Sequence, residues 1–165
     1  MTMRIDAMQS DDWERVRAIY LEGIATGNAT LETSAPEWED WDAAHLSFGR
    51  LAARIDDRLH GWAALSRVSG RCVYAGVAEV SVYVSTEARG AGIGRALLMR
   101  LIDESENNGI WTLQAGILPE NVASITLHKR CGFREVGVRE RLGQLNGIWR
   151  DVIVLERRSE IVGMD

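Results

Sequence analysis

The sequence predicts a mixed α/β fold. Strand-like and helix-like hydrophobic patterns alternate in the order β-α-α-β-β-β-α-β-α-β-β, which is typical of helices layered on a sheet. The 165 residues are enough for one domain, 1–165, with a full hydrophobic core. A composition of 46% hydrophobic and 26% charged residues excludes disordered, collagen-like and coiled-coil chains.

The chain opens with a strand and a helix. Residues 3–7 alternate polar and apolar side chains, which predicts a short strand. A helix is expected from Ser10 or Asp11, because Asp11 and Glu14 have the spacing of a capping box. The pair at 27–28, Gly-Asn, predicts its end.

The next segment predicts a second helix and a hairpin. Ser34-Ala35-Pro36-Glu37 has the pattern of a capping box with proline in the first turn, so a helix is expected to follow. Two strand-like runs, 50–55 and 62–65, flank a pair of aspartates at 56–57 that indicates a hairpin turn.

The second half of the chain has the stronger patterns. A strand is predicted over 73–84, a glycine-rich loop over 89–94 and an amphipathic helix over 93–107 that Gly109 ends. The remaining elements are expected to be a strand over 111–117, a helix over 121–131, and two closing strands over 133–138 and 148–155.

Charge and composition also exclude several functions. Nineteen basic and 24 acidic side chains give a net charge of −5, which does not suit nucleic-acid binding. Cys72, Cys131 and three scattered histidines have no disulfide or zinc-site spacing, so no metal is expected. The N-terminus has no apolar signal region, and no apolar run approaches the ~18 residues of a membrane span. We therefore expect a cytoplasmic protein without a membrane partner.

The glycine-rich loop is the clearest functional signal. It follows a strand and precedes a helix, so its glycines and the helix N-terminus can form a cradle for a pyrophosphate. A plain glycine-rich turn is the alternative. The spacing G-x-G-x-G does not match the dinucleotide fingerprint G-x-G-x-x-G, and Arg95-Ala96 replaces the Lys-Ser/Thr of a phosphate-binding P-loop.

Two motifs in order resemble the GNAT acetyltransferases. Arg89 to Gly94 resembles their acyl-coenzyme A loop, [Arg/Gln]-x-x-Gly-x-[Gly/Ala]. Residues 121–133 resemble their Asn-x-x-[Ala/Ser]-x-x-x-[Tyr/His]-x-x-x-Gly-Phe. The resemblance covers essentially the whole chain, and it implies a GNAT-type fold: a central, mostly antiparallel, twisted sheet flanked by helices.

Further residues resemble the phosphinothricin-type group of that family. These are Tyr74, Glu79 with 81–84, His128 and 147–151. The group acetylates the α-amine of glutamate-like antibiotics such as phosphinothricin, methionine sulfoximine and arsinothricin. Ala75, Val77-Ala78 and Leu31 depart from its usual residues, at positions expected to form substrate walls.

The resemblance implies a role for each site residue. The cosubstrate acetyl-CoA would contact Val82, Tyr83, Val84, Arg89, Gly90, Ala91, Gly92, Ile93, Gly94, Arg95, Asn121 and Ser124. The amino-acid substrate would contact Leu31, Glu32, Arg71, Tyr74, Val80, Ser81 and Trp149. The resemblance implies that Asn121 donates its amide to the pantetheine arm. A role as a helix N-cap alone is the alternative, and both can hold at once.

Two residues are candidates for proton transfer. Glu79 would remove the proton of the attacking amine, and an exposed structural glutamate is the alternative. His128 would protonate the leaving thiolate, and a helix-face histidine bonded to a carbonyl is the alternative. Arginines suit the substrate carboxylate, and the candidates are Arg67, Arg71, Arg139, Arg141 and Arg150.

The sequence therefore predicts an N-acetyltransferase acting on a small amino acid. The alternatives are an enzyme that acetylates proteins or peptides, and a non-catalytic acyl-CoA sensor that would have no use for Glu79. A homodimer is expected, because the two closing strands leave exposed edges and because Trp149 and Arg150 suit an interface.

Overall fold

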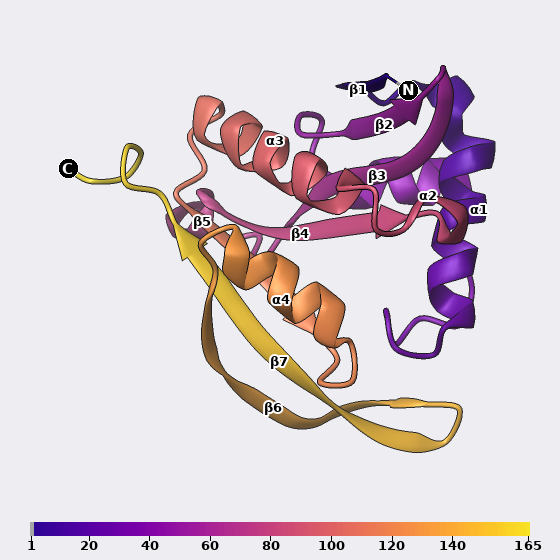
Figure 1. The fold of residues 1–165 in the computed structure, drawn as a ribbon. Helices are drawn as coiled ribbons and strands as arrows, with labels where there is room; N and C mark the ends of the chain where they lie inside the picture. The colour runs from indigo at the N-terminus through magenta and orange to yellow at the C-terminus, as the bar shows by residue number, and fades with distance from the viewer. Residues whose placement is uncertain (1) are drawn as a thin grey trace.

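The computed structural model describes residues 2–165, which form a seven-stranded sheet with helices on both faces (Figure 1). The strand order is β1-β2-β3-β4-β5-β7-β6. Among the strand pairs of the described residues only β4 and β5 run parallel, so the mixed and mostly antiparallel α/β prediction is confirmed. The strands are β1 (Met3–Ala7), β2 (Leu51–Ile55), β3 (Arg58–Arg67), β4 (Val77–Val84), β5 (Thr112–Ile117), β6 (Arg134–Leu145) and β7 (Ile148–Arg158). The helices are α1 (Trp13–Ala25), α2 (Trp38–Ala44), α3 (Ile93–Asn107) and α4 (Val122–Arg130).

The sheet separates two hydrophobic cores. Because side chains alternate along a strand, β3 contributes Ala63 and Leu65 to one face and Trp62 and Ala64 to the other. The first face packs against the leucines of α3, and the second packs against α1 and α2 through an aromatic cluster. Figure 1 shows α3 and α4 on one side of the sheet, and α1 at the right of the view.

Several expected elements are found as predicted. The amphipathic helix spans Ile93–Asn107, and Asp56 and Asp57 form the β2–β3 turn with φ of +49° and +67°. Two residues with positive φ are the signature of a two-residue hairpin turn that matches the twist of the strands.

Other boundaries were wrong. The strand expected over 73–84 begins at Val77, because Cys72–Tyr74 forms a 3-10 turn. The capping box is two residues earlier than expected: the Asp12 carboxylate accepts a hydrogen bond from the Gln9 N–H at 2.9 Å. The box expected over 34–37 is absent from the described chain, where α2 begins at Trp38 without a side-chain cap.

The β6–β7 hairpin is much longer than predicted. It extends away from the rest of the sheet (Figure 1). Strand β6 is exposed over nearly its whole length, and the hairpin leaves Val138, Leu142, Ile148 and Trp149 in solvent, with Trp149 55% exposed. A ribbon with this much exposed apolar surface differs from an ordinary monomer surface.

Candidate active site

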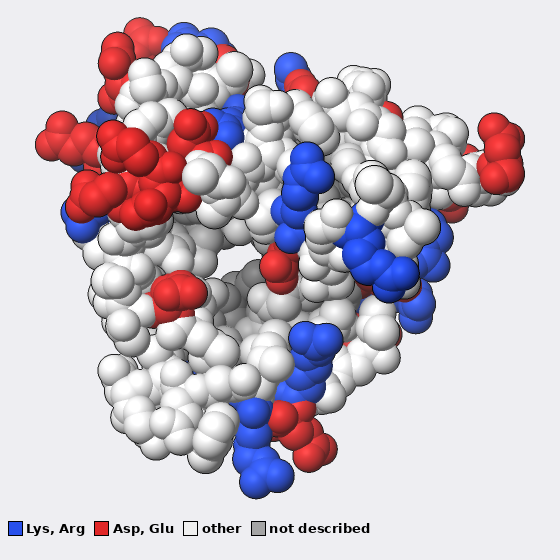
Figure 2. All heavy atoms as spheres, turned by 180° about the vertical axis from the view of Figure 1, so that it is seen from behind, with Lys and Arg blue, Asp and Glu red and all other residues white. Residues whose placement is uncertain are grey.

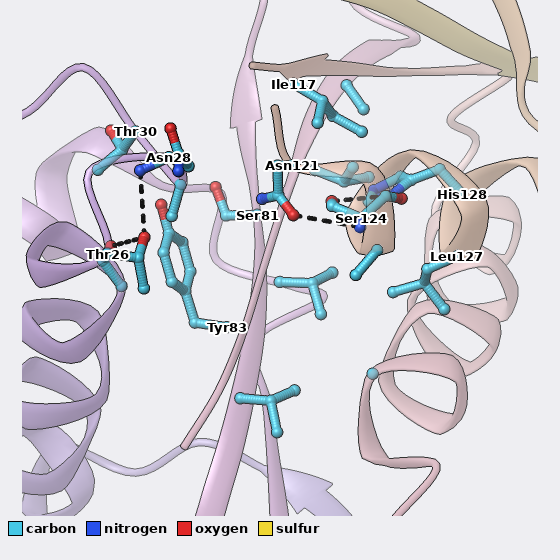
Figure 3. Close-up of a pocket in the computed structure, with 18 of the residues that line it drawn as sticks. Thr26, Asn28, Thr30, Ser81, Tyr83, Ile117, Asn121, Ser124, Leu127 and His128 are labelled. Carbon is cyan, nitrogen blue, oxygen red and sulfur yellow. Dashed lines mark hydrogen bonds between the residues drawn. The ribbon is translucent and has the colours of Figure 1, made fainter. Parts of the chain in front are cut away.

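A cavity of about 1070 Å³ runs between α1 and α4, across β4. Figure 3 shows Thr26, Asn28 and Thr30 on one side of it, Ser81 and Tyr83 on β4, and Asn121, Ser124 and His128 on the other side. We call the part at the glycine-rich loop (Arg89–Arg95) the loop end. The part formed by Tyr20, Trp41, His45, Trp62 and Tyr83 is the aromatic end.

Most of the expected site residues line this cavity. They are Leu31, Glu32, Glu79, Val80, Ser81, Val82, Tyr83, Val84, Arg89, Gly90, Gly92, Ile93, Gly94, Arg95, Asn121, Ser124 and His128. Four others are not among its lining residues: Arg71, Tyr74, Ala91 and Trp149. Residues from Leu31 to His128 therefore meet in one space, which hydrophobic periodicity does not reveal.

The loop end is built from backbone groups. Gly90 and Gly92 have φ of +81° and +82°, a region that side-chain-bearing residues rarely adopt. A Cβ at either position would lie more than 4 Å from any other heavy atom of the described chain, apart from the chain neighbours of that glycine. Gly92 is the N-cap of α3, and within residues 2–165 no side chain caps that helix. Its first N–H groups are therefore free to bind an anion.

Strands β4 and β5 separate at the centre of the cavity. Their parallel ladder has three residue pairs and ends where Glu79 lies beside Gln114. Beyond that point, residues 80–84 of β4 pair with β3 on one edge only. The other edge of β4 faces the gap with unpaired backbone groups, which an extended ligand can bond as an added strand would.

Glu79 is positioned at the point of separation. Its Oε1 atom would lie 3.5 Å from a Cβ built on Gly116 of β5, so the carboxyl group sits over a residue without a side chain. Burial raises the pKa of Glu79, while a hydrogen bond from Gln114 and the charge of Arg139 oppose that rise. A carboxyl group with a raised pKa is a better proton acceptor than an ordinary glutamate.

Helix α4 carries three polar residues on the cavity side (Figure 3). Asn121 caps the helix, as its Oδ1 accepts a hydrogen bond from the Ser124 N–H at 3.3 Å. His128 is only 5% exposed, and its Nδ1 lies 2.7 Å from the Ser124 carbonyl oxygen. Because a carbonyl can only accept, Nδ1 carries the proton and Nε2 has the lone pair of the neutral ring. Burial lowers the pKa of His128, which favours that neutral form.

The tyrosines at the aromatic end were not expected to form a pair. Tyr20 and Tyr83 meet edge to face, with ring centroids 5.0 Å apart. Burial raises the pKa of both, and the charge of Glu32 adds to the rise in each. Glu79 also raises the pKa of Tyr83, so the two carboxylates act on the same hydroxyl group. A helical residue and a strand residue 63 positions apart give no sequence signal of this contact.

Arg150 connects opposite sides of the cavity. Its guanidinium donates hydrogen bonds to the Gly27 carbonyl at 2.9 Å, to Asn28 Oδ1 at 2.8 Å and to Glu120 Oε2 at 3.0 Å. The first two partners follow α1, and Glu120 precedes α4. The expectation that Arg150 reaches a neighbouring chain stays a prediction, although these bonds hold its guanidinium within its own chain. Its three bonds within the chain also leave it poorly placed to bind a substrate carboxylate.

Three predicted substrate residues, Arg71, Tyr74 and Trp149, lie outside the cavity. Arg71 packs against Tyr74, with its guanidinium 5.5 Å from the ring centre, and both side chains are exposed. Trp149 points into solvent from the β6–β7 hairpin. The geometry of a single chain gives these three residues no contact with the cavity.

Residues 2–165 contain no helix that is both long enough and apolar enough to cross a membrane. The same residues contain no group of three or more His, Cys, Asp or Glu side chains that could hold a metal ion.

Comparison with known proteins identifies the family. The model of the acetyltransferase (GNAT) family matches residues 9–133. The chain belongs to the GNAT acetyltransferases. It is 33% identical to a phosphinothricin N-acetyltransferase of Alcaligenes faecalis, over 94% of this chain and 81% of that protein. It is 39% identical to an L-methionine sulfoximine/L-methionine sulfone acetyltransferase of Pseudomonas aeruginosa, over 50% of this chain and 48% of that protein.

A solved structure agrees with this assignment. A GNAT superfamily phosphinothricin acetyltransferase from Sinorhizobium meliloti, in complex with acetyl-CoA, has a TM-score of 0.85 and 27% identity. The match covers 100% of this chain and 97% of that one. The family and the names of its relatives make the chain an acyltransferase, and the expected GNAT fold is confirmed.

Proposed function

We propose that this acyltransferase moves the acetyl group of acetyl-CoA to the α-amine of a small amino acid, in the cytoplasm and without a metal. The observation that carries the proposal is the position of Glu79. Its carboxyl group lies where β4 and β5 separate, in the cavity that also contains the free N-terminus of α3. A proton acceptor and an anion cradle in one cavity suit an amine and a coenzyme thioester.

The loop end fits acetyl-CoA. The pyrophosphate would receive hydrogen bonds from the first N–H groups of α3, and Arg89 and Arg95 would add positive charge. The pantetheine arm would lie along the unpaired edge of β4 at Val82–Val84. The amide of Asn121 is available to it, because helix capping uses only the Oδ1 atom.

The reaction removes two protons from the amino group, one before and one after the attack, and returns one proton to the coenzyme thiolate. An α-ammonium group loses a proton to Glu79 and becomes a nucleophile. Its nitrogen then forms a bond to the thioester carbonyl carbon, and a backbone N–H near Val82 binds the developing oxyanion. Collapse of this intermediate breaks the C–S bond, and the coenzyme leaves as a thiolate that takes up a proton.

His128 is proposed to handle the second proton. In the resting protein its Nε2 is an acceptor, because Nδ1–H is bonded to the Ser124 carbonyl. The ring must therefore take a proton from the reacting nitrogen, directly or through water, before it can give one to the thiolate. The bond of His128 to a helix carbonyl and its proposed proton transfer to the thiolate are therefore compatible.

Arg139 is the best candidate for the substrate carboxylate among the five arginines considered. Its charge already acts on Glu79, so it lies near the proposed position of the amine. Arg150 is engaged within the chain, and Arg71 packs against Tyr74. A carboxylate bound by Arg139 would place the neighbouring α-amine close to Glu79.

We also propose that the β6–β7 hairpin is the surface of a homodimer. Val138, Leu142, Ile148 and Trp149 are each about half exposed or more, which leaves an apolar ribbon uncovered. A second copy would cover it in a two-fold arrangement. Such a dimer would bring Trp149 near a substrate cavity of the assembly.

The test is acetyl transfer by the purified protein. Thiol release from acetyl-CoA is followed with a panel of amino acids that includes methionine sulfoximine and phosphinothricin, and the product is located by mass spectrometry. We expect acetylation at the α-amine of at least one of them. Acetylation of peptides alone would favour the peptide enzyme, and acetyl-CoA binding without turnover on any amine would refute the proposed function.

A further inference from the structure

A side recess opens from the aromatic end of the cavity. It has a volume of about 370 Å³ and is lined by Tyr20, Glu32, Ser34, Pro36, Asp40, Trp41, Ala44 and His45. Five of these residues also line the main cavity: Tyr20, Glu32, Pro36, Trp41 and His45. The two spaces therefore lie side by side, and these five side chains face both of them.

The recess offers acceptors to a ligand. Glu32 and Asp40 contribute two carboxylates, and neither makes a salt bridge to any side chain of residues 2–165. His45 has its Nδ1 2.6 Å from the Trp41 carbonyl oxygen, so its Nε2 is the acceptor of a neutral ring. Burial lowers the pKa of His45, which keeps the ring uncharged.

Positive charge is scarce around the recess. Residues 18–49 contain no Lys or Arg, and they contain six acidic side chains: Glu22, Glu32, Glu37, Glu39, Asp40 and Asp42. Arg50 is the cation that packs against Trp41, 5.3 Å from the ring centre. It is held by the Asp42 side chain and by the carbonyls of His45 and Leu46. Figure 2 shows acidic side chains gathered on one side of the hollowed face.

The two ends of the main cavity carry charges of opposite sign. The arginines among its lining residues, Arg89 and Arg95, belong to the loop end. Glu32, which lines both spaces, lies close enough to Tyr20 and Tyr83 to raise their pKa values. An anionic side chain placed here would meet carboxylates at short range, whereas a cationic one would supply the donors that these acceptors lack.

We propose that the preferred acceptor is an α-amino acid with a cationic side chain, whose charged group lies in the recess between Glu32 and Asp40. The proposal rests on the proposed function, because it takes the α-amine to be at Glu79. Among the amino-acid substrates of that reaction, basic amino acids are favoured over neutral ones, and glutamate-like anions are disfavoured.

Arginine and citrulline form a matched substrate pair for the test. They have nearly the same shape, but only arginine carries a side-chain charge, and neither has a second amine that competes for the acetyl group. We expect kcat/KM for arginine to exceed that for citrulline by about 10-fold at low salt, the size of a partly exposed charge interaction. The ratio should fall as the ionic strength rises, because both carboxylates are exposed.

Substitutions locate the preference in the recess. Glu32→Gln and Asp40→Asn should each lower the arginine-to-citrulline ratio of kcat/KM, because each variant removes one of the two carboxylates of the recess. Glu39→Gln is the matched control, because it removes the same charge from an exposed α2 position outside the lining. That variant should keep the ratio.

The outcomes separate this proposal from the proposed function. Equal or faster turnover of citrulline, methionine sulfoximine or phosphinothricin would overturn the cationic preference and leave the α-amine N-acetyltransferase intact. A preference for arginine that persists in both Glu32→Gln and Asp40→Asn would overturn the recess assignment. Failure to acetylate any amino acid in the panel would refute the proposed function itself.

Discussion

The loop end and the aromatic end of the cavity are built in different ways. The loop end uses backbone N–H groups, two glycines with positive φ and a helix N-terminus, all from residues 89–96. The aromatic end uses side chains from α1, α2, β3 and β4, which are distant in the sequence. A local motif can therefore specify the first end, whereas the second exists only when several elements pack together.

This difference has a consequence for specificity. The backbone groups of the loop end bind the coenzyme, which is the same whatever amine is acetylated. The loop end can therefore stay the same while the acceptor substrate changes. Side chains such as Glu32 and Trp41 can be replaced without breaking the fold of the loop. Substitutions at each end test whether the two ends behave as separate parts.

Glu79→Gln tests the residue where the two ends meet. The substitution removes the proton acceptor and keeps the side-chain volume, so we expect kcat to fall by about 10²–10⁴-fold. Acetyl-CoA affinity should be unchanged, and calorimetric titration measures it. A variant that keeps most of its turnover would make Glu79 a structural residue.

The thermal stability of Glu79→Gln serves as a control, and the direction of its change can be predicted. The pKa of Glu79 is raised in the folded protein, so its charged form is less favourable there than in the unfolded chain. The contribution of Glu79 to the stability of the fold is therefore fully present when the pH is below its pKa in the unfolded chain. It is lost as the pH rises through its pKa in the folded protein. At pH 7 the Gln variant should therefore melt at the same temperature or slightly higher.

The pH profile gives a second prediction about Glu79. Because burial raises its pKa, the acid limb of kcat/KM should have its midpoint above the ordinary glutamate value of 4.5. Activity should fall by about tenfold per pH unit below that midpoint, since one deprotonated group is required. If the Glu79→Gln variant kept the same acid limb of kcat/KM, that limb would belong to another titrating group.

Gly92→Val should damage the loop end alone. A β-branched residue at φ +82° is strained by about 1–2 kcal/mol, and its side chain would occupy the open space of the cradle. We expect acetyl-CoA affinity to fall by about tenfold or more. Gly109→Val is the matched control, with φ +78° and open space around it at the other end of α3. Equal losses of affinity in both variants would mean that strain alone is responsible.

Arg150→Ala tests the connection between the two sides of the cavity. Removing its bonds to Gly27, Asn28 and Glu120 should loosen the segment after α1 and raise KM for the amino acid about 3- to 10-fold. KM for acetyl-CoA should change less, because the cradle lies on other elements. Arg58→Ala, an exposed control on β3, should leave both constants unchanged. A larger effect on acetyl-CoA would contradict the separation of the two ends.

Trp149→Ala should have the smallest effect on catalysis. Loss of a large interface side chain should weaken the dimer by about tenfold, which light scattering over a dilution series measures. KM for the amino acid should rise more than KM for acetyl-CoA. A mass near 18.4 kDa for the unmodified protein at micromolar concentration would remove the dimer proposal.

The sequence by itself determined the order of the elements and the loop end. The helix over 93–107, the Asp-Asp hairpin turn and the glycine-rich loop are local features, set by periodicity and by residues that adopt positive φ. Asn121 as a helix cap is local in the same sense. Each depends on neighbours within a few residues, so a linear reading finds it.

Only the tertiary structure determined how the aromatic end is formed and which partners Arg150 binds. Tyr20 meets Tyr83, and Arg150 bonds Asn28 and Glu120, only because α1, β4 and β7 pack around one cavity. The separation of β4 from β5 beyond Glu79 is likewise a property of the strand pair. Such contacts join residues 30 to 122 positions apart, and no local pattern encodes them because the packing of whole elements brings their side chains together.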